Sequence, residues 1–420
     1  MARLPSVDGD QDAWGDILNE YLLVGHHPDG THKTEVFGIF NVQAFGAVGD
    51  GVTDDTNAIQ AALNAAAPVG GVVWLTPTAH AYRCNGGLII PPHVTLKGGY
   101  SGMRRGLQLW GEPARGSTIH VYTTDVFLTM RHNTVLDGVE LFYPEQVTQG
   151  IPIPYGWTIH VPTDQHGVTI RNITCPNPYQ LLSVNADGIL IDSIQGYPLL
   201  VGIKLGRVAD VARITNIQFN PNVWAAAGAS LRTWVQTTGY CLDIEQAEEF
   251  MVQNFFGYGY LRGIWFRENL SSTGFPGSYG SINNFGFDSV QEGIIVETRG
   301  VSNRQGLSIS NGRIIPFAGT VGARTGIKLS DTGTPQGPAL SISNVSFFGA
   351  HERSIWIQSN SGVRMTMLGG QATEYTNEMV LCESATGVVR LVGVRSFNGI
   401  GPRINNGGGG NVSDTAPMAL

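Results

Sequence analysis

The sequence predicts an all-β fold, a right-handed parallel β-helix, in which short strands from successive coils of the chain stack on one another. Three observations support this prediction. The first is a recurring pattern of apolar residue, any residue, Asn and apolar residue. The second is the spacing of this pattern, and the third is a fixed offset between its members and later glycines. The six asparagines of the pattern are Asn172, Asn216, Asn254, Asn284, Asn311 and Asn344.

Asparagine and glycine adopt a left-handed backbone conformation more cheaply than other residues. Each asparagine is therefore expected to bend the chain between two strands, and Gly312 after Asn311 departs from the apolar pattern. Weaker members are Gly98, Gly138, Ser193 and Gly393. From Gly98 to Asn344, successive members lie 21 to 40 residues apart, which suits a solenoid with loop insertions. An antiparallel sandwich is the alternative, but it does not require a bend residue at a constant place in every turn.

A second repeat supports the same frame. Gly202, Gly263 and Gly293 each follow a member of the first pattern by nine residues, and each opens an apolar strand. Composition agrees, because 56 of 420 residues are glycine and only 14% are charged, which fits many turns and stacked strands. The net charge of −8, without a block of Lys and Arg, argues against nucleic acid as a partner.

The chain divides into three predicted parts. Residues 1–37 form a leader with an amphipathic helix at 12–23, whose apolar stripe must dock on something because so short a helix is marginal alone. Residues 38–400 form the β-helix, and a helix ending at Ala66 covers its first coil with Ile59, Ala62 and Leu63. Residues 401–420 are expected to be a flexible, Gly-rich tail.

Neither a signal peptide nor a membrane span is visible, and no membrane partner is expected. The four cysteines lack metal-ligand spacing, so neither a metal nor another cofactor is predicted.

The stretch FGAVGDGVTDDTNAIQAAL, residues 45–63, resembles the opening motif of pectate-lyase-superfamily proteins of the "pectate lyase 3" type. This resemblance implies a right-handed parallel β-helix. The family includes phage tailspike depolymerases and other polysaccharide lyases and hydrolases, many of them trimeric. The leader resembles segments that precede such β-helices in phage tail proteins. The opening motif is structural in the family and does not identify the chemistry.

Candidate site residues come from aligning the strands that follow each bend, where outward positions alternate with inward apolar ones. One outward column contains Lys204, Asp243, Trp265, Ile295, Lys328 and Trp356. The neighbouring outward column contains Gly206, Glu245, Arg267, Glu297, Ser330 and Gln358. Arg267 and Glu297 each lie 13 residues after their Asn, so we expect them to be neighbours, with Phe266 and Val296 pointing inward.

These columns suggest catalysis. Glu245 and Glu297 lie two coils apart, or roughly 9.6 Å, near the separation of the carboxylates in inverting glycosidases. With Asp243 they would supply acid and base, and Arg267 would bind a sugar acid. Trp265, Lys328 and Trp356 would contact the substrate. The alternative is a ladder of salt bridges on an ordinary exposed face, which stabilises the fold only slightly.

A second candidate is the repeated TIHV at 118–121 and 158–161. If these strands stack, His120 and His160 become neighbours and could serve as acid or base near neutral pH.

Two functions remain open on these grounds. One is a phage or phage-derived tail spike that binds and degrades a surface polysaccharide as a lyase or glycoside hydrolase. The other is a non-catalytic tail fibre or adhesin. A free secreted polysaccharide lyase is a third hypothesis, which the leader and the missing signal peptide favour less. We expect a homotrimer attached to tail or baseplate proteins through residues 1–37. The protein would therefore lie in the virion tail, or in the cytoplasm until assembly and release. An insertion at 220–239 could form a lid, a groove wall or a contact with a neighbouring subunit.

Overall fold

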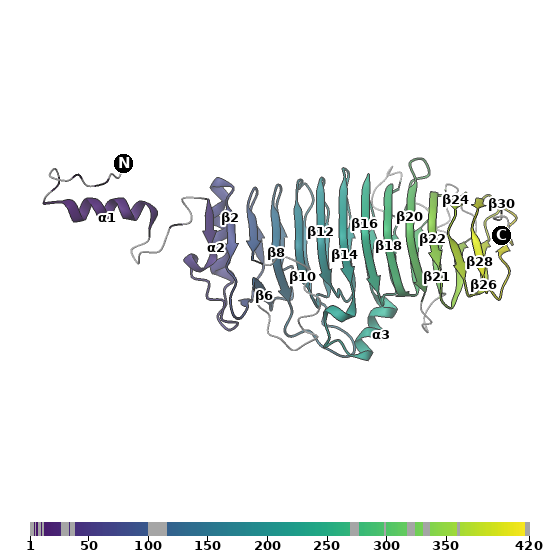
Figure 1. Ribbon diagram of the computed structural model, residues 1–420, viewed down its shortest axis with the longest axis horizontal. Coiled ribbons are helices and arrows are strands. Elements are labelled where there is room, and N and C mark those ends of the chain that lie inside the picture. The colour runs from purple at the N-terminus through teal and green to yellow at the C-terminus, as the bar shows by residue number, and fades with distance from the viewer. Residues whose placement is uncertain are drawn as a thin grey trace.

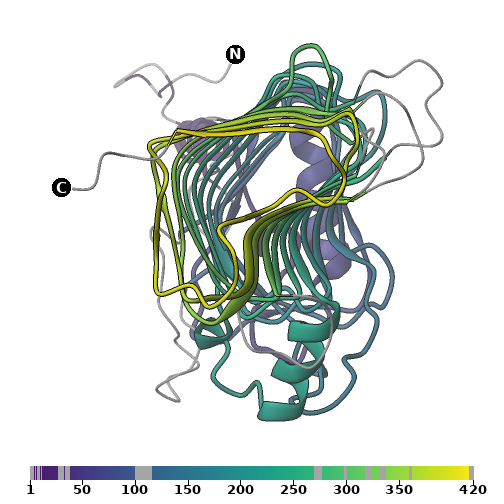
Figure 2. The same ribbon diagram turned by 90° about the vertical axis from the view of Figure 1, so that its right-hand side faces the viewer.

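The fold is a right-handed parallel β-helix, as the sequence predicts. Figure 1 shows its strands stacked along one axis, and Figure 2 views the coils end on. The computed structural model describes residues 4, 6, 10, 12–26, 33, 38–99, 116–268, 277–297, 300–316, 324–330, 337–358 and 362–415. Among the described helices, none has the length and apolar character needed to cross a membrane.

Successive coils pair in parallel and form two long sheets. The 12-stranded sheet consists of β4 (Leu88–Ile90), β7 (Leu128–Met130), β9 (Trp157–Val161), β11 (Gln180–Val184), β13 (Val201–Leu205), β15 (Tyr240–Ile244), β17 (Arg262–Phe266), β19 (Glu292–Glu297), β21 (Thr325–Ser330), β23 (His351–Ile357), β26 (Tyr375–Cys382) and β29 (Ile404–Asn405).

The 18-stranded sheet contains the strands that carry the asparagine bends. It consists of β1 (Ile39–Asn41), β2 (Val72–Leu75), β3 (Tyr82–Cys84), β5 (Thr95–Gly98), β6 (Thr118–Val121), β8 (Val135–Phe142), β10 (Thr169–Cys175), β12 (Ile189–Gly196), β14 (Ala212–Phe219), β16 (Phe250–Tyr258), β18 (Gly280–Val290), β20 (Leu307–Pro316), β22 (Ala339–Phe347), β24 (Arg364–Leu368), β25 (Gln371–Thr373), β27 (Val388–Val392), β28 (Arg395–Phe397) and β30 (Asn411–Thr415).

All six predicted asparagines adopt positive φ, between 51° and 56°, and so do Ser193, Gly138 and Gly393. Their amides also bond along the axis: Asn254 Nδ2 donates to Asn216 at 2.9 Å, and Asn344 Nδ2 donates to Asn311 at 3.0 Å. The asparagine column is therefore confirmed as one line of bends. Gly98 is the exception, because its φ is not positive. Glycine is needed there for space, since a Cβ would lie 2.2 Å from the carbonyl oxygen of Gly138.

The helices lie outside the coils. Helix α2 (Thr56–Ala66) buries Ile59, Ala62, Leu63 and Ala66 completely, which confirms the predicted apolar face, and Figure 1 shows it beside β2 at the first coil. Short 3₁₀ helices occur at Val42–Phe45, Ala67–Val69 and Pro221–Val223. Helix α1 (Trp14–Gly25) buries none of its residues and lies apart from the β-helix in Figure 1.

The prediction of a flexible tail at residues 401–420 is corrected by the structure. Strand β29 pairs with β26, and β30 pairs with β27, so the β-helix continues through Thr415 rather than ending at 400. Arg403 Nη2 also donates to Asp414 Oδ1 at 3.0 Å, which ties the last strand to the coil. The glycines at 407–410 form a turn between two paired strands, so their number did not indicate disorder.

Candidate functional site

The outward side of the 12-stranded sheet from β13 to β26 carries most of the predicted site residues, and we call it the charged face. Parallel pairing aligns Lys204 with Asp243, Asp243 with Trp265, and continues through Ile295 and Lys328 to Trp356, as the sequence predicted. Phe266 and Val296 are fully buried, which confirms that they point inward. The register of the columns is therefore correct.

The pairing of charges on this face differs from the expected ladder. Arg267 Nη2 contacts Asp243 Oδ2 on the preceding coil at 2.9 Å, and no ion pair joins Arg267 to Glu297 in the described part of the chain. Glu297 instead accepts a hydrogen bond from Trp265 Nε1 at 3.1 Å. Glu245 pairs with Lys204 at 2.8 Å. The arginine thus reaches toward the more deeply buried carboxylate.

Asp243 is the most perturbed carboxyl group of the charged face. It is 1% exposed, and burial raises its pKa to about 6 despite the opposing effect of Arg267. The charge of Glu245 raises the pKa further. Asp243 Oδ1 finds no hydrogen-bond partner among the described residues. A carboxyl group that is partly protonated near neutral pH, next to a second carboxylate, is a frequent feature of catalytic sites.

Trp265 already has aromatic and cationic neighbours. The guanidinium groups of Arg262 and Arg267 lie 4.0 and 3.9 Å from its ring centre, and the Tyr240 ring meets it edge-on at 5.4 Å. A sugar could stack on this indole only if one of these groups moved. The two arginines therefore stabilise the tryptophan in the position where a stacking platform was predicted.

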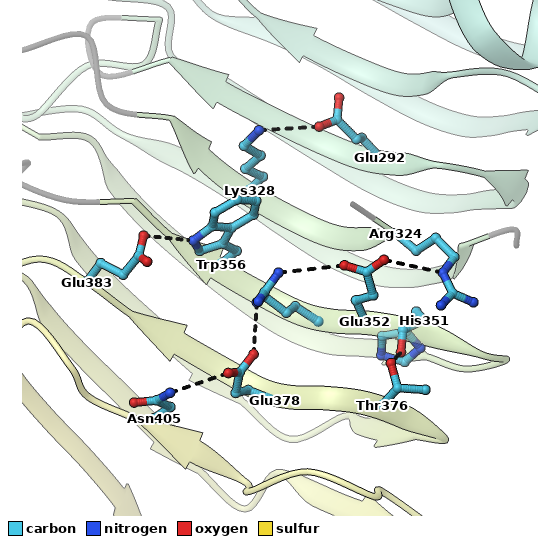
Figure 3. A network of polar contacts seen from close by, with 11 residues as sticks. Glu292, Arg324, Lys328, His351, Glu352, Trp356, Thr376, Glu378, Glu383 and Asn405 are labelled. Carbon is cyan, nitrogen blue, oxygen red and sulfur yellow. Dashed lines mark hydrogen bonds and ion pairs between the residues drawn. The ribbon is translucent and has the colours of Figure 1, made fainter. Parts of the chain in front are cut away.

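Lys328 and Trp356 belong to a second group of contacts, seen in Figure 3. Lys328 Nζ pairs with Glu292 at 3.4 Å and lies 4.9 Å from the Trp356 ring. Trp356 Nε1 donates to Glu383 at 3.0 Å. Each described cation of the charged face has a carboxylate partner: Lys204, Arg262, Arg267, Arg324, Lys328 and Arg353.

The predicted pair of His120 and His160 is wrong. His120 lies on β6, which pairs with β3 and β8 in the 18-stranded sheet. His160 lies on β9, which pairs with β7 and β11 in the 12-stranded sheet. The two identical TIHV segments occupy different sides of the coil, so these histidines do not stack. Burial lowers the pKa of both, which favours neutral rings.

The insertion at 220–239 packs against its own chain. It contains helix α3 (Ala229–Thr238), whose Leu231 and Val235 are fully buried, and Trp224 is 2% exposed. Ser230 Oγ donates to Gln149 Oε1 at 2.6 Å, which joins the helix to an earlier loop. The insertion is therefore anchored to its own chain on the outside of the coils.

A groove that sequence reasoning missed lies on the 18-stranded sheet, across β16, β18, β20 and β22. Its volume is about 570 Å³, within the usual range of small-ligand sites. We call it the Asn groove, because the asparagine bends form part of it. Its lining consists of Asn254, Phe255, Phe256, Asn284, Phe285, Gly286, Phe287, Asp288, Asn311, Gly312, Arg313, Ile315, Asn344 and Ser346.

Gly286 explains why a hollow forms here, and Gly312 gives room to the ring of Phe285 beneath it. Gly286 aligns with Phe256 on one side and Arg313 on the other, so the outward row lacks a side chain between them. Gly312, the exception in the Asn pattern, would place a Cβ 2.0 Å from Phe285 Cζ, so the ring occupies that space. The sequence did contain a sign of this groove, namely a glycine within two residues after the bend on each of two neighbouring coils, Gly286 after Asn284 and Gly312 after Asn311.

The coils and their outward polar surfaces define a parallel β-helix of the pectate-lyase-like class. The chain belongs to the family described as "Rhamnogalacturonase A/epimerase, pectate lyase-like", whose model matches residues 39–314.

Sequence relatives match over short segments. A capsule-specific depolymerase of Klebsiella phage K5-2 is 41% identical over 93 residues, which is 22% of this chain and 11% of the depolymerase. Alginate lyase 7 of Azotobacter vinelandii is 47% identical over 66 residues, which is 14% of this chain and 8% of the lyase. The chain thus aligns with about a tenth of the length of these relatives.

Solved structures share the fold at low sequence identity. The catalytic unit of an α-1,3-glucanase from Streptomyces thermodiastaticus superposes with a TM-score of 0.57 at 16% identity, covering 90% of this chain and 68% of the glucanase unit. A tailspike protein of E. coli bacteriophage HK620 superposes with a TM-score of 0.52 at 11% identity, covering 86% of this chain and 68% of the tailspike. At these identities the likeness supports the fold alone.

Proposed function

We propose that the protein binds a polysaccharide and cleaves it, with the chemistry at Asp243, Glu245 and Arg267 of the charged face. The observation that carries this proposal is the buried carboxyl group of Asp243, whose pKa of about 6 leaves it partly protonated near neutral pH. Glu245 follows two residues later, directly after β15 ends, so its Cα lies within about 7 Å of that of Asp243. Two neighbouring carboxyl groups, one of them protonated, suit an acid and a base in hydrolysis.

The roles follow from exposure and contacts. Asp243 would donate a proton, and Glu245, whose side chain is 27% exposed, would act as the base. Arg267 covers Asp243 and would pair with the carboxylate of an acidic sugar. That exchange removes the nearest cation from Asp243, which favours its protonated form. Glu297 would orient Trp265 rather than act as acid or base, since it accepts the indole N–H.

Relatives support polysaccharide as the substrate class. The capsule-specific phage depolymerase and the alginate lyase both have names that denote action on polysaccharides, although they match only short segments. Family membership over residues 39–314 supports the same class.

Product analysis tests the proposal. The protein is incubated with bacterial surface polysaccharides, and new reducing ends and the ultraviolet absorbance of unsaturated uronates are recorded. Reducing ends without that absorbance indicate hydrolysis, and both together indicate elimination. The rate should fall as pH rises above about 6, because Asp243 then loses the proton it donates. A rate that rises through this range would exclude Asp243 as the acid.

A binding-only function is the second candidate. The observation that favours it is the pairing of each described cation on the charged face with a carboxylate, as in a structural ladder. Binding of a polysaccharide without either product would support this candidate and reject cleavage.

We also propose that the leader attaches the protein, as a homotrimer, to a tail or baseplate. Helix α1 exposes Trp14 at 48% and Leu22 at 41%, an apolar surface that water does not favour. Deleting residues 1–37 should leave the β-helix folded and abolish incorporation into a phage particle. Incorporation of the truncated protein at the normal level would show that the leader is not an anchor.

A further inference from the structure

The Asn groove differs from the charged face in its electrostatics. Arg313 is exposed and lines the groove, yet none of the described carboxylates forms an ion pair with it. Its guanidinium instead lies 5.3 Å from the centre of the Phe348 ring, a contact that orients the group without neutralising its charge. A fixed, unneutralised arginine in a hollow is suited to a carboxylate or sulfate group of a ligand.

The asparagine line supplies hydrogen-bonding groups along the same hollow. Asn284 Nδ2 donates to Asn254, but Asn311 Nδ2 donates to Asn283 Oδ1 at 3.0 Å instead of to Asn284. The ladder is therefore interrupted in the middle of the groove, and the side-chain Oδ1 of Asn284 accepts no hydrogen bond from the described residues. An exposed amide with unused hydrogen-bonding capacity is suited to the hydroxyl groups of a sugar.

An aromatic surface completes the arrangement. Phe256 is half-buried and lines the groove beside Gly286, where a Cβ would lie 3.2 Å from the Phe256 ring. Because Gly286 has no side chain, the Phe256 ring can lie close to its backbone and present an apolar surface to the groove, suited to the apolar face of a sugar. The four coils span roughly 14 Å at the usual strand spacing, enough for a short stretch of a linear chain lying parallel to the axis.

We propose that the Asn groove is a second, non-catalytic site that binds an acidic oligosaccharide segment, with Arg313 pairing with its acidic group. The groove lies on the 18-stranded sheet, whereas the proposed catalytic residues follow strands of the 12-stranded sheet, so the two proposals depend on different residues. Such a site would hold the polymer independently of its cleavage.

Binding to an oligosaccharide array tests the groove. The array carries uronate-, sialate- and sulfate-bearing oligosaccharides together with their neutral counterparts. The full-length protein should bind acidic members and not the neutral ones. Arg313→Gln should weaken this binding by roughly 10- to 100-fold, the scale of a lost charge-assisted hydrogen bond. Phe256→Ala should weaken it as well. Arg213→Gln is the matched control, because Arg213 is exposed on the same sheet and does not line the groove.

The outcomes separate this proposal from the enzymatic one. The groove proposal is judged by how much Arg313→Gln weakens binding relative to Arg213→Gln, and this comparison does not depend on whether the parent cleaves a polysaccharide. Three results would overturn the groove proposal. They are a parent protein that binds no acidic member of the array, an Arg313→Gln variant that binds as well as the parent, and an Arg213→Gln variant that also loses binding. A change in the molecular mass of Arg313→Gln by light scattering would also overturn it, because the groove would then be a contact between subunits.

Discussion

Glu245→Gln is expected to lower the turnover of a cleavable polysaccharide by about 100-fold or more, the usual scale for losing a general base. Glutamine keeps the shape of the side chain but cannot accept a proton. The half-buried pair with Lys204 contributes little to folding, about 0–1 kcal/mol, so the variant should remain folded. Initial rates on the substrate found by product analysis, together with unfolding midpoints, provide the measurement.

Glu352→Gln is the matched control for this prediction. Glu352 lies on the same charged face, its side chain has the same 27% exposure as that of Glu245, and it contacts Arg324 at 3.7 Å. It is four strands away from β15 along the sheet. A general loss of charge on this face would slow both variants equally. Full activity in Glu245→Gln would show that Glu245 is not the general base and that the catalytic site lies elsewhere in the molecule.

The charged face and the Asn groove differ in how much of each could be predicted from the sequence. Alternation along a strand placed Asp243, Trp265 and Lys328 correctly in one column, because direction depends on local backbone geometry. The partner of Arg267 could not be predicted in the same way. A long side chain can reach several positions on adjacent coils, and burial of Asp243 decides which carboxylate it meets.

The failures have a common physical origin. The two TIHV segments are identical, yet each coil has several strands, and the number of bends between the segments determines whether they stack. The asparagine bends were predictable because a left-handed conformation is a property of the single residue. The Asn groove was not predicted because it depends on Gly286 lying between Phe256 and Arg313 of the adjacent coils, which only the register brings together.

The core of the central coils is where a single substitution should cost most. Phe287 is fully buried, and its ring centre lies 5.5 Å from that of Phe285 and 6.0 Å from that of Phe255. The predicted glycine repeat exists partly to admit this ring, because a Cβ at Gly263 would lie 2.7 Å from Phe287 Cγ. Gly263 therefore has no side chain that could fill the space if the ring is removed.

Phe287→Ala should lower the free energy of unfolding by about 3–5 kcal/mol, the usual cost of leaving a cavity in place of a buried aromatic ring. Phe397→Ala is the control, since Phe397 is 47% exposed and its loss should change stability by about 0.5 kcal/mol or less. Urea unfolding followed by circular dichroism measures both. Equal midpoints for the two variants would mean that neighbouring side chains move into the space of the missing ring, so that no cavity remains.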